Sequence, residues 1–249
     1  AYLKEDLLPG KQTFNKFDVP DYIFNLTNNV PWNKLYLKEF ITKNKLQYQA
    51  IKQANDTYFT IMALFLAERI TYVKDVLIAY RVNNDESLSG KASDTVFCAY
   101  DSWLYAKEHI EKYPDFNLVR FSFLNRALSG FYHALNIQTT FESYEKLYRK
   151  LVEEGFHEFG LDECTEENIY AVWMYKDMQK MYETEPADFL VQKSITRRVN
   201  NENNNVRRKI LREKNAVLRE NVQALKEDKK TLQSDKKKLQ EEKKKLEGE

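Results

Sequence analysis

Residues 55–82, NDTYFTIMALFLAERITYVKDVLIAYRV, hold the change of pattern that decides the fold. Their first part has helical spacing, because apolar side chains recur three and four positions apart at Phe59, Met62, Ala63, Leu66 and Ala67. Asp56 or Asn55 can cap the amino end of this helix. The β-branched and aromatic runs ITYV and VLIAYRV follow and predict two short strands. This stretch therefore predicts a local mixture of helix and strand.

The flanking sequence extends this mixed segment to residues 1–91. Residues 19–26 predict a helix or turn opened by Pro20, Pro31 interrupts the chain, and residues 37–44 have helical spacing. The polar run NNDESLSGK at 83–91 predicts a loop that closes the segment.

Residues 92–199 have helical patterns only. Apolar stripes predict four helices and a short fifth one, at 95–112, 118–137, 141–154, 166–182 and 187–198. Amphipathic stripes need a partner surface, so we expect a helical subdomain packed on the first segment.

Residues 200–249 predict a third kind of structure. Asn200–Asn205 is an Asn-rich run that we expect to act as a hinge. Beyond it, leucines stand seven apart at Leu211, Leu218, Leu225, Leu232, Leu239 and Leu246. With leucine at the d positions of a heptad, the a positions hold Asn215, Val222, Lys229, Lys236 and Lys243. One Asn at an a position can fix the register, but three lysines there weaken a homodimer. We expect a long coiled-coil-like helix with weak self-association.

Composition and charge narrow the classes of function. The chain is 43% apolar and 31% charged, with no apolar run long enough to span a membrane and no signal peptide. Cys98 and Cys164 fit no disulfide framework, which predicts a reducing, cytoplasmic location. Residues 194–249 carry 17 basic and 10 acidic side chains, so a basic tail follows an acidic body. Loose attachment of that tail to anionic lipids at the inner face of the membrane is an alternative to a solvated helix.

Several catalytic and binding motifs are absent. The sequence has no Gly-rich phosphate loop, GxSxG, HExxH or CxxC motif. The tail places basic clusters before its leucines, as basic-region leucine zippers do, but its basic side is rich in Asn and the a positions are poor. We therefore expect no nucleic-acid binding.

Four features between Pro31 and Ser89 resemble bacterial glycosyltransferases of family 2, which have a GT-A fold. They are WNKLYLKEF, NDTYF, the pair ITYVKDVLIAYR, and the loop ending ESLSG, in their usual order. The resemblance extends more loosely over residues 1–135. It implies that residues 1–91 are the acceptor-side part of a GT-A domain, within a chain that is α+β and mostly helical.

The resemblance also implies a set of site residues. Asp56 matches the catalytic base of an inverting transfer, and Asn55 replaces the usual Glu beside it. Arg81 and Ser87 match contacts to the donor diphosphate, whereas Asp85 stands where some relatives have His. The loop residues Trp32, Asn33 and Lys34 match a region near the acceptor or donor sugar. The alternatives are structural: Asp56 as a helix cap, Arg81 in a surface ion pair, Ser87 as an ordinary loop hydroxyl, and Trp32 with Tyr36 in the core.

Family 2 enzymes hold the nucleotide and a divalent metal in an amino-terminal half that ends in a DxD-type motif, and this sequence has no DxD. We therefore expect Mg²⁺ or Mn²⁺ in a full-length enzyme, no metal bound by this chain, and no transferase activity of this chain alone. The implied partners are a nucleotide-sugar donor and a cell-surface polysaccharide or teichoic-acid-like acceptor. The alternative is a non-catalytic helical scaffold that works through its coiled-coil tail.

Overall fold

A computed structural model describes residues 3–75, 78–79 and 93–246. The chain divides into two compact units, Ala1–Phe189 and Leu190–Glu249. The segments predicted as 1–91 and 92–199 therefore share one unit up to Phe189. The second unit begins at Leu190 and includes the predicted tail at 200–249.

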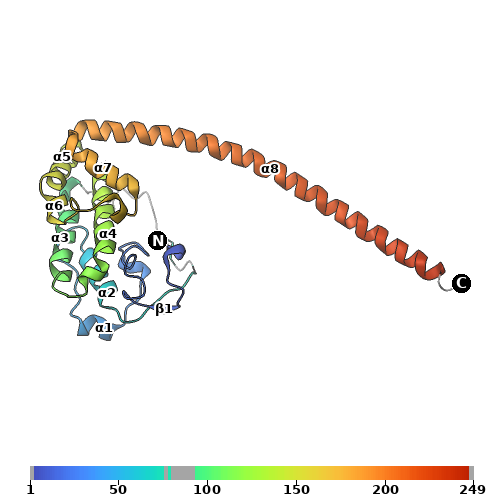
Figure 1. The fold of residues 1–249 in the computed structure, drawn as a ribbon, viewed down its shortest axis with the longest axis horizontal. Coiled ribbons are helices and arrows are strands. Elements are labelled where there is room, and N and C mark those ends of the chain that lie inside the picture. Colours follow the sequence, from blue (N-terminus) through green and yellow to red (C-terminus); the bar gives the residue numbers. More distant parts are fainter. Residues whose placement is uncertain (1–2, 76–77, 80–92, 247–249) are drawn as a thin grey trace. The chain divides into compact units, whose positions relative to one another are not determined.

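The amino-terminal part of the first unit consists mostly of turns. It holds two short 3₁₀ turns (Glu5–Leu7 and Pro31–Asn33), strand β1 (Thr13–Phe14), helices α1 (Lys38–Lys43) and α2 (Thr57–Leu66), and strand β2 (Ile70–Thr71) (Figure 1). The strands pair antiparallel, with Thr13 opposite Thr71 and Phe14 opposite Ile70. The first predicted strand is thus confirmed but short. Most of the second, VLIAYRV, lies outside the described residues.

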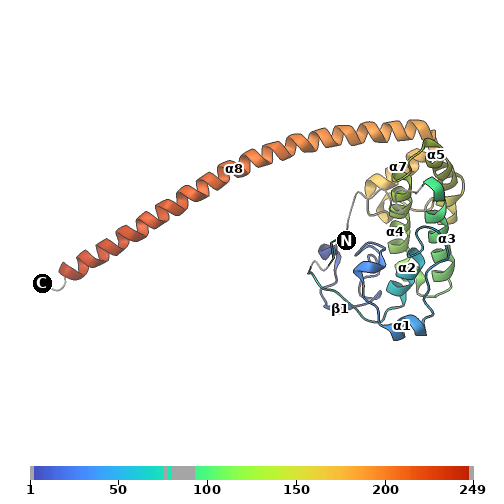
Figure 2. The ribbon, with the colours of Figure 1, turned by 180° about the vertical axis from the view of Figure 1, so that it is seen from behind.

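Helices dominate the described residues of the first unit from 93 onward (Figure 2). They are α3 (Cys98–Ile110), α4 (Phe116–Asn136), α5 (Phe141–Lys150), a π-helical turn (Leu151–Gly155), α6 (Phe156–Glu158), a 3₁₀ turn (Glu166–Asn168) and α7 (Val172–Glu183). The predicted helices are confirmed, except that the one expected from residue 166 begins at Val172. The GT-A architecture is not decided by this arrangement, because the described sheet has only two short strands.

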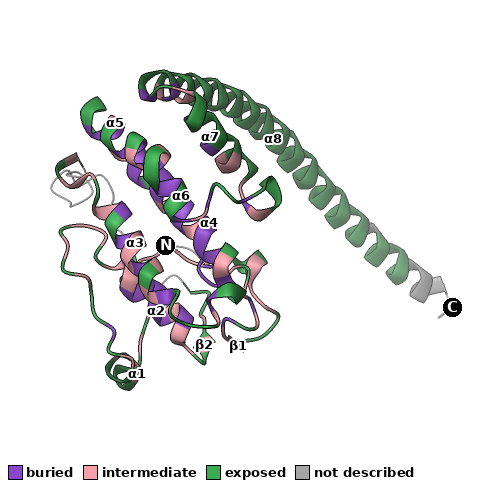
Figure 3. Cartoon of the chain, turned by 60° about the vertical axis from the view of Figure 1, so that its left-hand side comes forward, coloured by how far each residue is buried: buried purple, intermediate pink, exposed green. Residues whose placement is uncertain are grey.

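The core of the first unit is centred on α2, α3 and α4, whose buried residues are purple in Figure 3. Helix α2 packs against α3, and α3 packs against α4. Seven of the ten α2 residues are buried, so this helix is covered on more than the single face predicted. The amino-terminal turns are fastened to α4 at Ser122, whose hydroxyl accepts the Phe24 N–H at 3.1 Å. The Asn25 amide donates to the Ser122 carbonyl at 2.8 Å.

Helix α8 (Pro186–Leu246) is a single helix of 61 residues. The hinge predicted at Asn200–Asn205 is wrong, because the helix runs through it without a break. Asn is a weak helix former, but each one costs only about 0.7 kcal/mol or less relative to Ala, and neither Gly nor Pro occurs there. Every side chain that the structure describes from Ser194 to Glu241 is exposed. Within the described residues, no helix is both long and apolar enough to cross a membrane.

Candidate functional site

Asp56 lies at the amino end of α2, directly after a strained turn. Its backbone carbonyl accepts hydrogen bonds from the N–H and the hydroxyl of Thr60, both at 2.9 Å. Its carboxylate makes no capping hydrogen bond to the helix. The preceding Ala54 has φ of 56°, in the left-handed region that favours glycine. The structure thus does not support the alternative in which the Asp56 side chain serves as the cap.

Lys34 follows the Pro31–Asn33 turn and ties that loop together. Its Nζ donates to the carbonyl of Asn28 at 2.7 Å, the carbonyl of Val30 at 3.0 Å and the Oδ1 of Asn33 at 2.8 Å. All three protons of the ammonium group therefore have acceptors within the loop. This contact set explains how a lysine can be held in a partly buried position.

The charges of Lys34 and Asp56 shift each other's pKa, although the two residues lie 22 positions apart in the sequence. Burial and the positive charge of Arg126 lower the pKa of Lys34 to about 8, and the charge of Asp56 acts in the opposite direction. Burial raises the pKa of Asp56, whereas its own backbone N–H and the charge of Lys34 lower it. The two groups are not among the ion pairs within 4.0 Å, so their interaction acts over a longer distance.

Tyr36 adds a buried hydroxyl to this cluster. Its oxygen is shielded from solvent and has no hydrogen-bond partner among the described residues. Burial is the main cause that raises the pKa of Tyr36, followed by the nearby Tyr48 and Asp56. Its ring meets Phe59 of α2 edge-on, with ring centroids 5.1 Å apart. A buried hydroxyl without a hydrogen bond costs free energy, so Tyr36 gains no such stabilisation from the described residues.

Arg126 of α4 is the second member of the cluster that the sequence did not indicate. Its Nε donates to Oδ1 of Asn29 at 3.0 Å, which brings α4 to the loop that holds Lys34. No local motif could have shown this, because Asn29 and Arg126 are 97 positions apart. Tyr36 was more accessible to sequence reasoning, since it lies two residues after Lys34 in the motif WNKLY.

The other residues predicted for the site are not all part of the cluster of Lys34, Tyr36, Asp56 and Arg126. Trp32 is 36% exposed, so the alternative that placed it in the core does not hold. Asn33 contributes its side-chain oxygen to Lys34. Asn55 is exposed and its carbonyl accepts the Gln49 N–H at 3.1 Å. Arg81, Asp85 and Ser87 lie outside the described residues.

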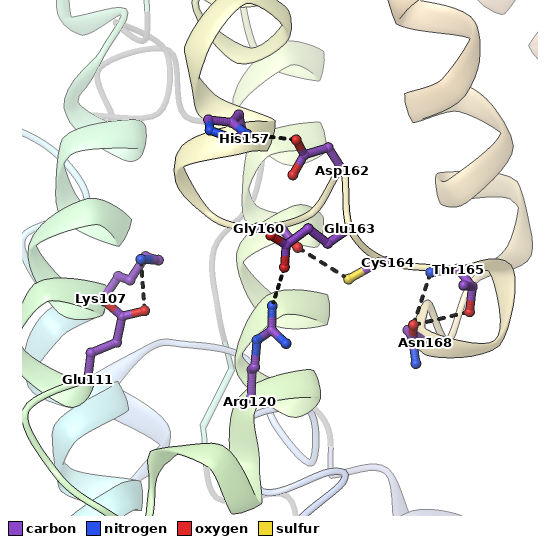
Figure 4. A network of polar contacts seen from close by, with 10 residues as sticks. All are labelled: Lys107, Glu111, Arg120, His157, Gly160, Asp162, Glu163, Cys164, Thr165 and Asn168. Carbon is purple, nitrogen blue, oxygen red and sulfur yellow. Dashed lines mark hydrogen bonds and ion pairs between the residues drawn. The ribbon is translucent and has the colours of Figure 1, made fainter.

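A second polar network lies at residues 157–168 and is structural in character (Figure 4). His157 contacts Asp162 at 2.8 Å, and Arg120 of α4 pairs with Glu163 at 3.3 Å. The side chains of this network bond to one another and to backbone, and they bridge α4 to the turn before α7. No three His, Cys, Asp or Glu side chains of the described part of the chain gather in a way that could hold a metal ion.

Comparisons with known proteins identify no relative of this chain. No protein-family model matches it, and neither the curated proteins nor the solved structures contain a significant match.

Proposed function

We propose that this chain is the acceptor-side part of a glycosyltransferase of the family 2 type, with a GT-A fold in the complete domain. The parent enzyme transfers a sugar from a nucleotide-sugar donor to a glycan acceptor such as a cell-surface polysaccharide. The observation that carries the proposal is the half-buried Asp56 carboxylate at the start of α2, on which the charge of Lys34 acts from more than 4.0 Å away. The four sequence features around this pair support the same assignment.

The chemistry requires a base on the acceptor side. The Asp56 carboxylate takes the proton of an acceptor hydroxyl as its oxygen bonds to the anomeric carbon of the donor sugar. The bond from that carbon to the diphosphate breaks, and its electron pair leaves with the phosphate oxygen. Partial burial raises the pKa of the carboxyl group and makes its carboxylate a stronger base than an exposed one, whereas the charge of Lys34 favours the ionised form.

The divalent metal of the family does not fit the residues described here. Hard cations need several carboxylate or carbonyl ligands, and the described residues offer no cluster of that kind. A donor diphosphate and its metal belong to a nucleotide-binding segment, and Arg81 and Ser87 remain proposed contacts to the diphosphate.

Asp56→Asn in an enzyme that joins this chain to a nucleotide-binding half tests the proposal. The amide keeps the shape of the side chain but cannot take a proton, so we expect transfer to fall by about 10²–10⁴-fold. Asp75→Asn is the matched control, because Asp75 is an exposed carboxylate of the same segment. Transfer at a near wild-type rate in Asp56→Asn would overturn the assignment of the base.

The chain alone provides a second test. We expect no turnover with UDP- and CDP-linked donors, because the residues that hold the nucleotide are in the other half. Measurable transfer by the isolated chain would contradict the proposal that the nucleotide-binding residues lie in another segment.

A further inference from the structure

Helix α8 exposes a regular stripe of apolar side chains along its length. Leucines at the d positions from Leu211 to Leu239 are 50–68% exposed, and Val222 at an a position is 43% exposed. A helix that exposes a leucine every seventh residue over five repeats has the pattern of a coiled coil. Such a pattern is buried when a second helix covers it.

We propose that α8 pairs with a second copy of itself in an antiparallel two-stranded coiled coil. This inference is independent of the glycosyltransferase proposal, because it uses only residues 190–249. It deepens the expectation of weak self-association by giving the pair an orientation.

A parallel pair places like charges in its core. In that orientation each a residue faces the same a residue of the other copy, so Lys229 faces the partner's Lys229 and Lys236 faces the partner's Lys236. Two ammonium groups confined at one layer repel each other, and both would lose water. The flanking g and e positions add Lys214 against Arg219, another repulsive pair.

An antiparallel pair removes these contacts, because each a residue then faces a d leucine. With the two-fold axis between residues 223 and 224, Val222 faces the partner's Leu225, Lys229 faces the partner's Leu218, and Lys236 faces the partner's Leu211. The four-carbon stem of a lysine can cover a leucine while its ammonium group reaches water. Asn215 faces the partner's Leu232 in the same way. Every one of these layers therefore contains at least one leucine.

One pair of flanking residues opposes this arrangement and provides the test. Antiparallel helices bring e positions together, so Arg219 lies next to Lys226 of the partner, twice per dimer. In a parallel pair Lys226 lies next to Asn221 instead. Lys226→Glu therefore turns two repulsions into two attractions only in the antiparallel dimer. Lys230→Glu at a b position, which faces solvent in both orientations, changes the net charge equally and is the matched control.

Analytical ultracentrifugation of the full chain at low salt measures the effect. We expect a reversible dimer whose Kd is roughly tenfold lower for Lys226→Glu than for Lys230→Glu, since two pairs each change sign. Equal Kd values for the two variants, or a chain that stays monomeric at every concentration, would overturn the proposal.

Distance measurement gives the orientation directly. A spin label on Glu241→Cys, with Cys98 and Cys164 replaced by Ala, reports the separation of the two labels in the dimer. At 1.5 Å per residue the antiparallel pair separates them by about 50 Å, whereas a parallel pair brings them within about 20 Å. A short distance would reject the antiparallel pair even if the chain dimerises.

Discussion

Lys34 is held by two opposing influences. Its three hydrogen bonds and the charge of Asp56 favour the ammonium form, whereas burial and Arg126 favour the neutral amine and bring its pKa down to about 8. The hydrogen bonds that hold the Asn28–Lys34 loop together therefore depend on whether Lys34 is protonated.

This lowered pKa predicts a pH dependence of stability. An unfolded lysine has a pKa near 10.5, so between about pH 8 and 10.5 the unfolded chain binds more protons than the folded one. The contribution of Lys34 to the free energy of unfolding should therefore rise with pH across this window, by roughly 1–3 kcal/mol. Urea denaturation at several pH values compares the native chain with Lys34→Met. Lys52→Met, at an exposed position, is the control. A difference between Lys34→Met and the native chain that stays constant with pH would contradict the prediction.

Ala54 is the strained residue that precedes the proposed base. For an L-residue with a side chain, the left-handed region costs about 1–2 kcal/mol, which glycine avoids. Ala54→Gly should therefore raise the free energy of unfolding by about 0.5–1 kcal/mol after the greater freedom of glycine in the unfolded chain is included. Ala106→Gly in α3 should lower it by at least about 1 kcal/mol. Thermal or chemical denaturation measures both variants, and a destabilised Ala54→Gly would refute the strain argument.

At the scale of elements, the approach of α3 to α4 depends on Gly130. A Cβ at this position would lie 2.3 Å from Nε1 of Trp103, a buried indole with little room to move. Gly130→Ala should therefore destabilise the first unit by about 1–3 kcal/mol through overpacking. Ser129→Ala, one residue earlier and only partly buried, is the control. If chemical denaturation shows the two variants to be equally stable, the packing of α3 on α4 differs from that described.

Local patterns predicted most elements, and long-range contacts account for the differences. The spacing in residues 55–70 predicts α2 well, because the apolar positions of one helix are adjacent in sequence. The late start of α7 could not be predicted, since Asn125 of α4 donates to the Asn168 carbonyl at 2.7 Å and accepts the Tyr170 N–H at 2.7 Å. The pairing of β1 with β2 is equally non-local.

The candidate site follows the same rule. A motif could place Asp56 at a helix start and Lys34 in a loop, because each belongs to a short run of sequence. The effect of Arg126 on Lys34, and the unpaired hydroxyl of Tyr36, arise from folding of distant segments. Sequence reasoning thus found the two charged groups, but not the effect of Arg126 on Lys34 or the buried hydroxyl of Tyr36.

At the scale of the whole molecule, the two units should differ in how they unfold. The first unit has a shared core, whereas the described side chains of α8 are exposed from Ser194 to Glu241. Helices without tertiary burial melt gradually, whereas packed domains melt cooperatively. Removal of residues 190–249 should therefore leave the Tm of the first unit unchanged within about 2 °C, since 1 kcal/mol corresponds to about 2–4 °C at this size. Calorimetry of residues 1–189 and of the full chain measures both values. A loss of more than about 5 °C would mean that the tail contributes to the stability of the core.

The lowered pKa of Lys34 also has a consequence for covalent chemistry. At pH 7 about one Lys34 side chain in ten is a free amine, compared with roughly one in three thousand for an ordinary lysine. Only the free amine is nucleophilic. Lys34 is only partly buried, so activated esters should acylate it at a lower pH than they acylate the exposed lysines of the tail. Acylation would remove the positive charge that lowers the pKa of Asp56. Mass spectrometry of acylated peptides would then report on the electrostatics of this site without any substrate.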